Sequence, residues 1–287
     1  MNKRFTWLGL ILPTLLTTLV ACSDNDPPPT PPVMVVRSAI LTGAQESPPT
    51  PSAATGRGAV VVNPVTREIT GGITFTGVTP TVGGHHIHRA PAGNAAGNGP
   101  VIVPLVLAPG GGVATIAAGT ILTEDQYASL LAGELYFNVH SVAFPAGEIR
   151  GQITIVGGVT AAIARLTPAQ EVPPVTSSTA SGLGTIVFDA TTRAIIIAYV
   201  THNVANDNNA HIHTGAIGVH GPANIVNPFT RGTGVWTVPS PTPAPLTAQQ
   251  VTDINSGNAY FNVHSVAFPG GKIRGQLCDP VLVATCR

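Results

Sequence analysis

Apolar and polar residues alternate along most of the chain, as they do in β-strands that bury one face. Residues 58–62 and 68–75 alternate in this way on either side of a turn at Asn63-Pro64, which predicts a β-hairpin. Further strands are expected at 101–107, 135–140 and 148–156. The pattern therefore predicts a chain of short strands joined by tight turns.

Two short segments depart from the alternation and predict one helix in each half of the chain. The segments are Thr123-Glu-Asp-Gln126 and Thr247-Ala-Gln-Gln250, and both place a threonine three residues before a glutamine. This spacing is typical of a capping box, in which both side chains satisfy backbone N–H groups at the start of a helix.

The second half of the chain repeats the first. The decapeptide that begins at Tyr136 recurs unchanged from Tyr260, and the segment 41–49 recurs with few changes at 166–174. Shorter motifs recur as well: His86-Ile-His88 at 211–213, Gly99-Pro100 at 221–222 and 149–152 at 273–276. Each unit is roughly 115 residues long, which is an ordinary size for one domain.

The number of expected strands sets the fold class. About seven or eight strands per unit, with turn signals at short intervals, favour an all-β fold. We expect two tandem Greek-key antiparallel β-sandwich domains, each with one short helix. Their expected bounds are 36–156 and 162–278, with a linker at 157–161 and a C-terminal tail at 279–287.

The repeated motifs resemble those of the chordin (CHRD) domain family. The resemblance rests on His-Ile-His, the following Gly-Pro, the helical Leu-Thr-Glu-Asp and the closing Tyr-Phe-Asn-Val-His…Phe-Pro-Ala-Gly-Glu-Ile-Arg-Gly-Gln. It covers nearly all of both units and implies an extracellular β-domain. The sequence lacks the cysteine-rich modules through which chordin engages growth factors, so the resemblance does not imply that role.

The composition argues against a nucleic-acid partner. Only 9% of the residues are charged, and 13 basic side chains balance 13 acidic ones, whereas phosphate binding requires a basic surface. The 32 glycines and 27 prolines accompany abundant valine, isoleucine and threonine, which is typical of strands and turns.

The N-terminus predicts a lipid anchor. Two positive charges in residues 1–4 precede a mostly apolar run that ends in Leu19-Val-Ala-Cys22. This matches the bacterial lipobox, in which residues 1–21 are removed as a signal peptide and the cysteine is acylated. An uncleaved membrane anchor is the alternative, but the apolar run is shorter than the roughly 20 residues that span a bilayer. We therefore expect an exported, lipid-anchored protein of the cell envelope, at the outer membrane, the periplasmic face or the cell surface.

The segment 22–35 is expected to be a tether, because five prolines fall between positions 27 and 32 and favour an extended spacer. With Cys22 assigned to lipid, two cysteines remain. We predict a disulfide between Cys278 and Cys286 that pins the C-terminal tail, since disulfides form in exported proteins. Two free thiols are the alternative.

Six of the nine histidines form matched pairs between the units. His86, His88 and His140 correspond to His211, His213 and His264, whereas His85, His202 and His220 have no counterpart. Alternation places the side chains of a His-Ile-His strand on one face and the isoleucine on the other. If the apolar residues point inward, all three histidines of a unit lie on the outer face and converge wherever their strands are neighbours.

Three histidines with an open coordination position suit zinc or copper. The alternative is a hydrogen-bonded His/Asn cluster, covered by the loop around Gly99-Pro100, that needs no metal. A His-x-His strand on the outside of a Greek-key sandwich is also similar to the copper/zinc superoxide dismutases. However, the sequence has no counterpart of the bridging histidine, the zinc-ligating aspartate or the disulfide of that family.

Charged residues are few within the repeated motifs, so those that recur are informative. Glu46 and Arg150 recur as Glu171 and Arg274. We expect two buried ion pairs, Glu46–Arg150 and Glu171–Arg274, that fix the first strand of each unit against the last.

Together these features predict an envelope lipoprotein that displays two CHRD domains as a binding or structural module, with the three-histidine sets as candidate metal sites. Its expected partners are the membrane, through the lipid, and an extracellular protein. The rival functions are a copper-dependent enzyme similar to superoxide dismutase and metal sequestration without turnover. We assign no catalytic residue, because no serine or cysteine in the repeated motifs has an evident general base.

Overall fold

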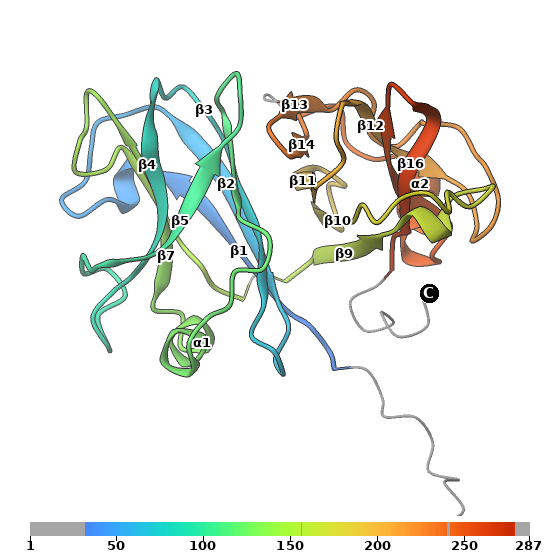
Figure 1. Ribbon diagram of the computed structural model, residues 1–287. Coiled ribbons are helices and arrows are strands. Elements are labelled where there is room, and N and C mark those ends of the chain that lie inside the picture. Colours follow the sequence, from blue (N-terminus) through green and yellow to red (C-terminus); the bar gives the residue numbers. More distant parts are fainter. Residues whose placement is uncertain (1–31, 156, 240–241, 279–287) are drawn as a thin grey trace, which may run out of the picture. The chain divides into compact units, whose positions relative to one another are not determined.

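The structure is a computed structural model that describes residues 32–155, 157–239 and 242–278 (Figure 1). The expected signal peptide, Cys22, most of the expected tether and Cys286 lie outside the described residues. Within the described ranges, no helix is both long enough and apolar enough to cross a membrane.

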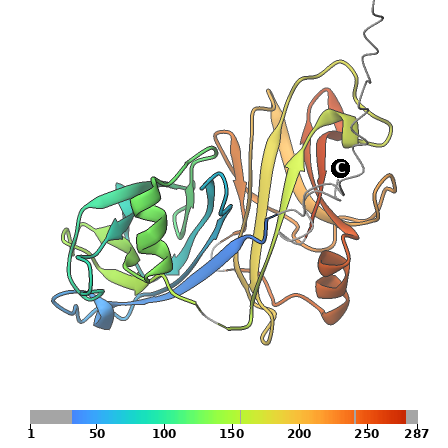
Figure 2. The same cartoon turned by 90° about the horizontal axis from the view of Figure 1, so that it is seen from below.

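The first repeat is an antiparallel barrel with one short α-helix. Its strands close in the order β1-β2-β3-β6-β5-β4-β7-β8. The elements are β1 (Val35–Thr42), the 3₁₀ turn η1 (Gly43–Gln45), β2 (Thr55–Val62), β3 (Ile69–Thr76), β4 (Pro80–Arg89), β5 (Val101–Leu107), β6 (Val113–Ile116), α1 (Glu124–Leu131), β7 (Leu135–Ser141) and β8 (Ile149–Gln152). The helix α1 is seen end-on in Figure 1 and along its length in Figure 2.

The second repeat has the same element types in two separate sheets. One sheet has the order β13-β14-β11-β10-β9, and the other has the order β12-β15-β16. The elements are β9 (Val159–Leu166), η2 (Pro168–Gln170), β10 (Gly182–Asp189), β11 (Ile195–His202), β12 (Asp207–Thr214), β13 (Thr230–Gly232), β14 (Val235–Thr237), α2 (Ala248–Asn255), β15 (Ala259–Ser265) and β16 (Phe268–Gln276). The expected all-β class with two tandem domains and one short helix in each is confirmed.

The repeats differ in whether their sheets close. In the first repeat, β5 pairs with β4 on one side and with β6 on the other, so it joins the two halves of the barrel. In the second repeat, the segment that follows β12 touches that strand through a single bridge, Ile212 to Val226. The ladder is interrupted there and also between β9 and β16, which are joined only by the isolated bridges Thr167 to Arg274 and Ile163 to Cys278, so two sheets result.

The hairpins and helices form for the local reasons expected from the sequence. In the turn between β2 and β3, the side-chain oxygen of Asn63 accepts hydrogen bonds from the backbone N–H groups of Val65 and Thr66. Both predicted capping boxes are present, at Thr123 and at Thr247. The predicted alternation also holds, because Ile87, on β4, is fully buried in the core of the first repeat.

Candidate metal centres

Neighbouring strands bring three histidines together in each repeat. In the first repeat β4 and β7 are antiparallel partners, with His86 opposite Asn138 and His88 opposite Tyr136. The side chains of His86, His88 and His140 therefore share the outer face, and one ring nitrogen of each lies within 4.8 Å of the others. We call this group site 1.

The second repeat builds the same arrangement, which we call site 2. The pairing of β12 with β15 places His211 opposite Asn262 and His213 opposite Tyr260. One nitrogen of each of His211, His213 and His264 again lies within 4.8 Å of the others. In the part of the chain that the structure describes, these two sites are the only groups of three side chains arranged to hold a metal ion.

Backbone carbonyls set the tautomers of two histidines in site 1. Nδ1 of His88 lies 2.9 Å from the carbonyl oxygen of Gly99, and Nδ1 of His140 lies 3.0 Å from that of Pro145. A carbonyl oxygen only accepts hydrogen bonds, so both Nδ1 atoms carry the proton and both Nε2 atoms keep a free lone pair.

The free nitrogens of site 1 have no partner. Nε2 of His88, Nε2 of His140 and Nδ1 of His86 are all buried and make no hydrogen bond. Each histidine thus contributes one buried, unpartnered nitrogen, whereas most buried polar groups in folded proteins are hydrogen-bonded.

Site 2 has the same carbonyl contacts but one additional bond. Nδ1 of His213 donates to the carbonyl oxygen of Gly221 at 2.9 Å, and Nδ1 of His264 donates to that of Pro269 at 3.0 Å. Because Nδ1 of His264 carries the proton, its Nε2 accepts a hydrogen bond from Nδ1 of His211 at 3.1 Å. Only Nε2 of His213 is buried without a partner in this site.

Burial favours the neutral imidazole at His86, His88, His211, His213 and His264. It lowers the pKa values of His88 and His211 to about 4, because a charged ring loses its hydration when buried. Burial also lowers the pKa values of His86, His213 and His264. The neutral ring is the form that binds metals.

The expected direct ion pair between Glu46 and Arg150 is wrong. Both side chains are buried, but the two N–H arms of the Arg150 guanidinium donate to the loop that precedes Gly99. The acceptors are the carbonyl oxygens of Ala95 at 2.6 Å, Ala96 at 3.4 Å and Gly97 at 3.1 Å and the side-chain oxygen of Asn98 at 3.1 Å. These contacts take the guanidinium out of bonding distance of Glu46.

The twin pair Glu171–Arg274 is corrected in the same way. The Arg274 guanidinium donates to the carbonyl oxygens of Ala216 at 2.8 Å and Val219 at 3.0 Å. The arginine still acts on Glu171 through space, since its charge lowers the pKa of that carboxyl.

Burial outweighs the arginine charge at both glutamates and raises the pKa of Glu46 and of Glu171 to about 7. In the first repeat, Oε1 of Glu46 and Oδ1 of Asn138 are buried without partners. Both atoms lie against Gly147, where an added Cβ would be 2.7 Å from the first and 2.6 Å from the second. Protonation of Glu46 supplies a hydrogen-bond donor to this group of acceptors.

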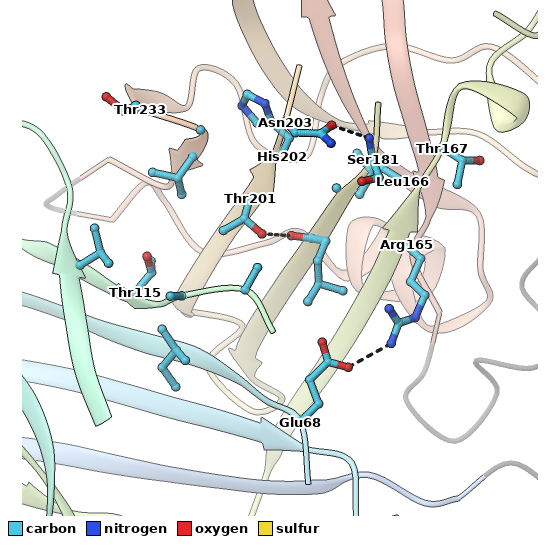
Figure 3. A pocket seen from close by; sticks show the side chains of 18 residues that line it. Glu68, Thr115, Arg165, Leu166, Thr167, Ser181, Thr201, His202, Asn203 and Thr233 are labelled. Carbon is cyan, nitrogen blue, oxygen red and sulfur yellow. Dashed lines mark hydrogen bonds and ion pairs between the residues drawn. The ribbon is translucent and has the colours of Figure 1, made fainter. Parts of the chain in front are cut away.

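The unmatched histidines are members of neither site. His85 is fully buried beside Phe75, on the opposite face of β4. His202, at the end of β11 (Figure 3), has Nε2 3.6 Å from Oδ2 of Asp207. His220 is hydrogen-bonded to the carbonyl oxygen of Val172. Cys278 is buried, and its disulfide with Cys286 stays a prediction because Cys286 lies outside the described residues.

Sequence reasoning missed the two tyrosines beside the sites. The ring of Tyr136 stacks on His88, with centroids 5.0 Å apart and planes at 14°, and Tyr260 stacks on His213 at 4.8 Å and 16°. The sequence did indicate these tyrosines, because each begins the decapeptide that recurs unchanged.

The fold and the two sites define a tandem all-β module with one outer-face histidine cluster in each repeat. The chain belongs to the CHRD domain family, whose model matches residues 37–153 and 162–277. No curated protein and no solved structure matches the chain.

Proposed function

We propose that this protein is a metal-binding module of the cell envelope, in which each CHRD domain holds one zinc or copper ion through three histidines. The observation that carries the proposal is the set of buried, unpartnered nitrogens at site 1, one from each histidine. Leaving several buried acceptors without a donor costs free energy, and a bound metal ion would satisfy all three.

The hydrogen-bonded His/Asn cluster explains site 1 less well. The side chain of Asn138, opposite His86, donates to Glu46 and not to a histidine. The histidines of site 1 make no hydrogen bonds to one another. Such a cluster would be expected to satisfy its own nitrogens.

The donor set supports zinc or copper over the harder cations. Each site offers imidazole nitrogens and no carboxylate, whereas calcium and magnesium prefer oxygen ligands. Carbonyl oxygens hold the other ring nitrogen of His88, His140, His213 and His264. This second contact is typical of histidines that ligate metals.

The envelope location rests on the Leu-Val-Ala-Cys22 motif. We expect Cys22→Ala to release the protein from the membrane fraction, because the acylated residue is lost. If Cys22→Ala partitions like the wild type, the lipid anchor is contradicted. The proposal of two metal sites does not depend on this result.

Metal titration tests the sites themselves. The purified full chain should bind two equivalents of zinc or copper, His140→Ala should bind one, and the double variant with His264→Ala should bind none. His202→Ala is the control, since this histidine lies at the end of β11 beside Asp207 and belongs to neither site, and it should keep both equivalents. A wild-type protein that binds neither metal through histidine would favour the hydrogen-bonded cluster and overturn the proposal.

The metal-loaded protein also separates the rival functions. Superoxide consumption that depends on bound copper and is lost in the double variant would support a redox enzyme. Stoichiometric binding without turnover would support sequestration or display.

A further inference from the structure

Three planar groups are stacked beside each site. In the first repeat, the ring of Tyr136 lies between the imidazole of His88 and the guanidinium of Arg150, whose central carbon is 3.4 Å from the tyrosine centroid. The second repeat has the same stack of His213, Tyr260 and Arg274, with 3.5 Å between the guanidinium and the ring. Tyr136 is buried, so its plane limits the rotation of the imidazole that it covers.

The tyrosine hydroxyl contacts the same residue whose carbonyl oxygen sets the histidine tautomer. The backbone N–H of Gly99 donates to the hydroxyl of Tyr136 at 3.1 Å, and the carbonyl oxygen of Gly99 accepts the Nδ1 proton of His88. In the second repeat, the N–H of Gly221 donates to the hydroxyl of Tyr260 at 3.2 Å. One side chain thus touches its histidine through the ring and holds the acceptor of that histidine through the hydroxyl.

The glycine is required for this contact. A Cβ at Gly99 would collide with the carbonyl oxygen of Arg89, and a Cβ at Gly221 would collide with that of Thr214. The loop can approach the end of the histidine strand closely only because this residue has no side chain. The glycine of the recurring Gly-Pro motif and the tyrosine therefore act together on the histidine.

We infer that Tyr136 and Tyr260 are positioning residues of the two metal sites. The ring fixes the plane of His88 or His213, and the hydroxyl holds the glycine whose carbonyl oxygen keeps Nε2 of that histidine unprotonated. Arg150 and Arg274 act through the tyrosine, because each guanidinium holds the outer face of the ring. The inference rests on the proposed metal-binding function, but the tautomer of His88 can be measured without metal.

A tyrosine that only fills space would behave differently from a positioning residue. Phenylalanine preserves the volume and the stacking and removes only the hydroxyl. A purely structural role therefore predicts that Tyr136→Phe leaves the tautomer of His88 and the metal affinity unchanged.

The first measurement uses the metal-free full chain. Nitrogen chemical shifts of the histidine rings report which nitrogen carries the proton. The wild type should show His88 with the proton on Nδ1, and Tyr136→Phe should transfer a measurable fraction of it to Nε2. Tyr127→Phe, in α1, is the matched control, because its hydroxyl takes no part in the contacts described above.

The second measurement is zinc affinity at site 1, in a His264→Ala background that disables site 2. Tyr136→Phe should weaken binding about tenfold, as is typical when a partner of a metal-ligating histidine is lost. Tyr136→Leu, which also removes the ring, should weaken it further, and Tyr127→Phe should leave it unchanged. In the opposite background, with His140→Ala, Tyr260→Phe should have the same effect on site 2.

An unchanged His88 tautomer together with unchanged zinc affinity in Tyr136→Phe would overturn the inference. If the wild type binds no metal, the proposed function fails and the tautomer alone decides the inference. A wild-type His88 with its proton on Nδ1 and a Tyr136→Phe variant without this preference would then still support it.

Discussion

The two repeats arrange their three matched histidines alike but surround them differently. At site 1 each histidine has one buried nitrogen without a partner, whereas at site 2 the imidazoles of His211 and His264 are hydrogen-bonded to each other. The strands β7 and β15 are nearly identical in sequence, whereas β4 and β12 share little beyond His-Ile-His. The difference therefore arises in the rest of β4 and β12 and in the segments that cover the sites. The comparison teaches that the strand pairing determines which histidines converge, and that the neighbouring segments determine whether their nitrogens are free to bind a metal ion.

The covering loop is the largest of these differences. Ten residues, 89–98, separate the His-Ile-His strand from Gly99 in the first repeat, and seven residues, 214–220, separate it from Gly221 in the second. The longer loop offers Arg150 four acceptors, and the shorter one offers Arg274 two. The arginine therefore binds the loop more extensively in the first repeat.

The hairpins that carry His140 and His264 also differ in charge. Glu148, on the hairpin that carries His140, becomes Lys272 on the hairpin that carries His264. The Glu148 carboxylate accepts a hydrogen bond from Ser52 at 2.7 Å, whereas the Lys272 ammonium lies 3.7 Å from the ring centroid of Phe268.

The largest expected effect is the loss of the loop anchor. Arg150→Met keeps a long side chain but leaves four acceptors without their donor, so we expect a loss of about 3 kcal/mol in the free energy of unfolding. Arg274→Met should cost about half as much, because two loop carbonyls are affected. Urea denaturation of both variants measures the difference, and equal losses would contradict the role assigned to loop length.

A second effect, of comparable size for each glutamate, concerns pH, where the two repeats should behave alike. The pKa of Glu46 and of Glu171 is about 7 in the folded protein, above the ordinary value of 4.5. Folding therefore favours the protonated carboxyl, and its contribution to stability is lost as pH rises from about 4.5 to 7. The double variant with Glu46→Gln and Glu171→Gln should flatten this decline, with each glutamate contributing up to about 3 kcal/mol.

Thermal or urea unfolding between pH 4.5 and pH 8 is the measurement. Each single variant should remove a similar part of the decline, because the two carboxyls have the same surroundings. A double variant with the same pH dependence as the wild type would show that the glutamates stay ionised when folded.

The smallest expected effect is a difference in metal affinity. Site 2 must break the hydrogen bond between His211 and His264 before both nitrogens can bind a metal, at a cost of about 1 kcal/mol. Zinc titration of His264→Ala, which retains site 1, should therefore show about fivefold tighter binding than His140→Ala, which retains site 2. Tighter binding at site 2 would mean that the hydrogen bond prepares the ligands for the metal.

Much of the site could be predicted because it depends on local pattern. Strand alternation places His86 and His88 opposite Ile87, and the recurrence of the decapeptide in both repeats indicates that His140 belongs with them. The structure adds that β4 and β7 are neighbours. No local pattern indicates that Arg150 would bind loop carbonyls, because those acceptors lie more than fifty residues away in the chain.

The sequence by itself determined the repeat, the strand faces, the capped helices and the matched histidines, because each follows from residues that are close in the chain or recur in it. Only the tertiary structure decided that the first repeat closes into a barrel and the second does not. It also decided that Tyr136 and Gly99 contact each other and that both contact His88. Such contacts depend on where a loop ends in space, and loop paths are set by the sum of many weak and distant interactions.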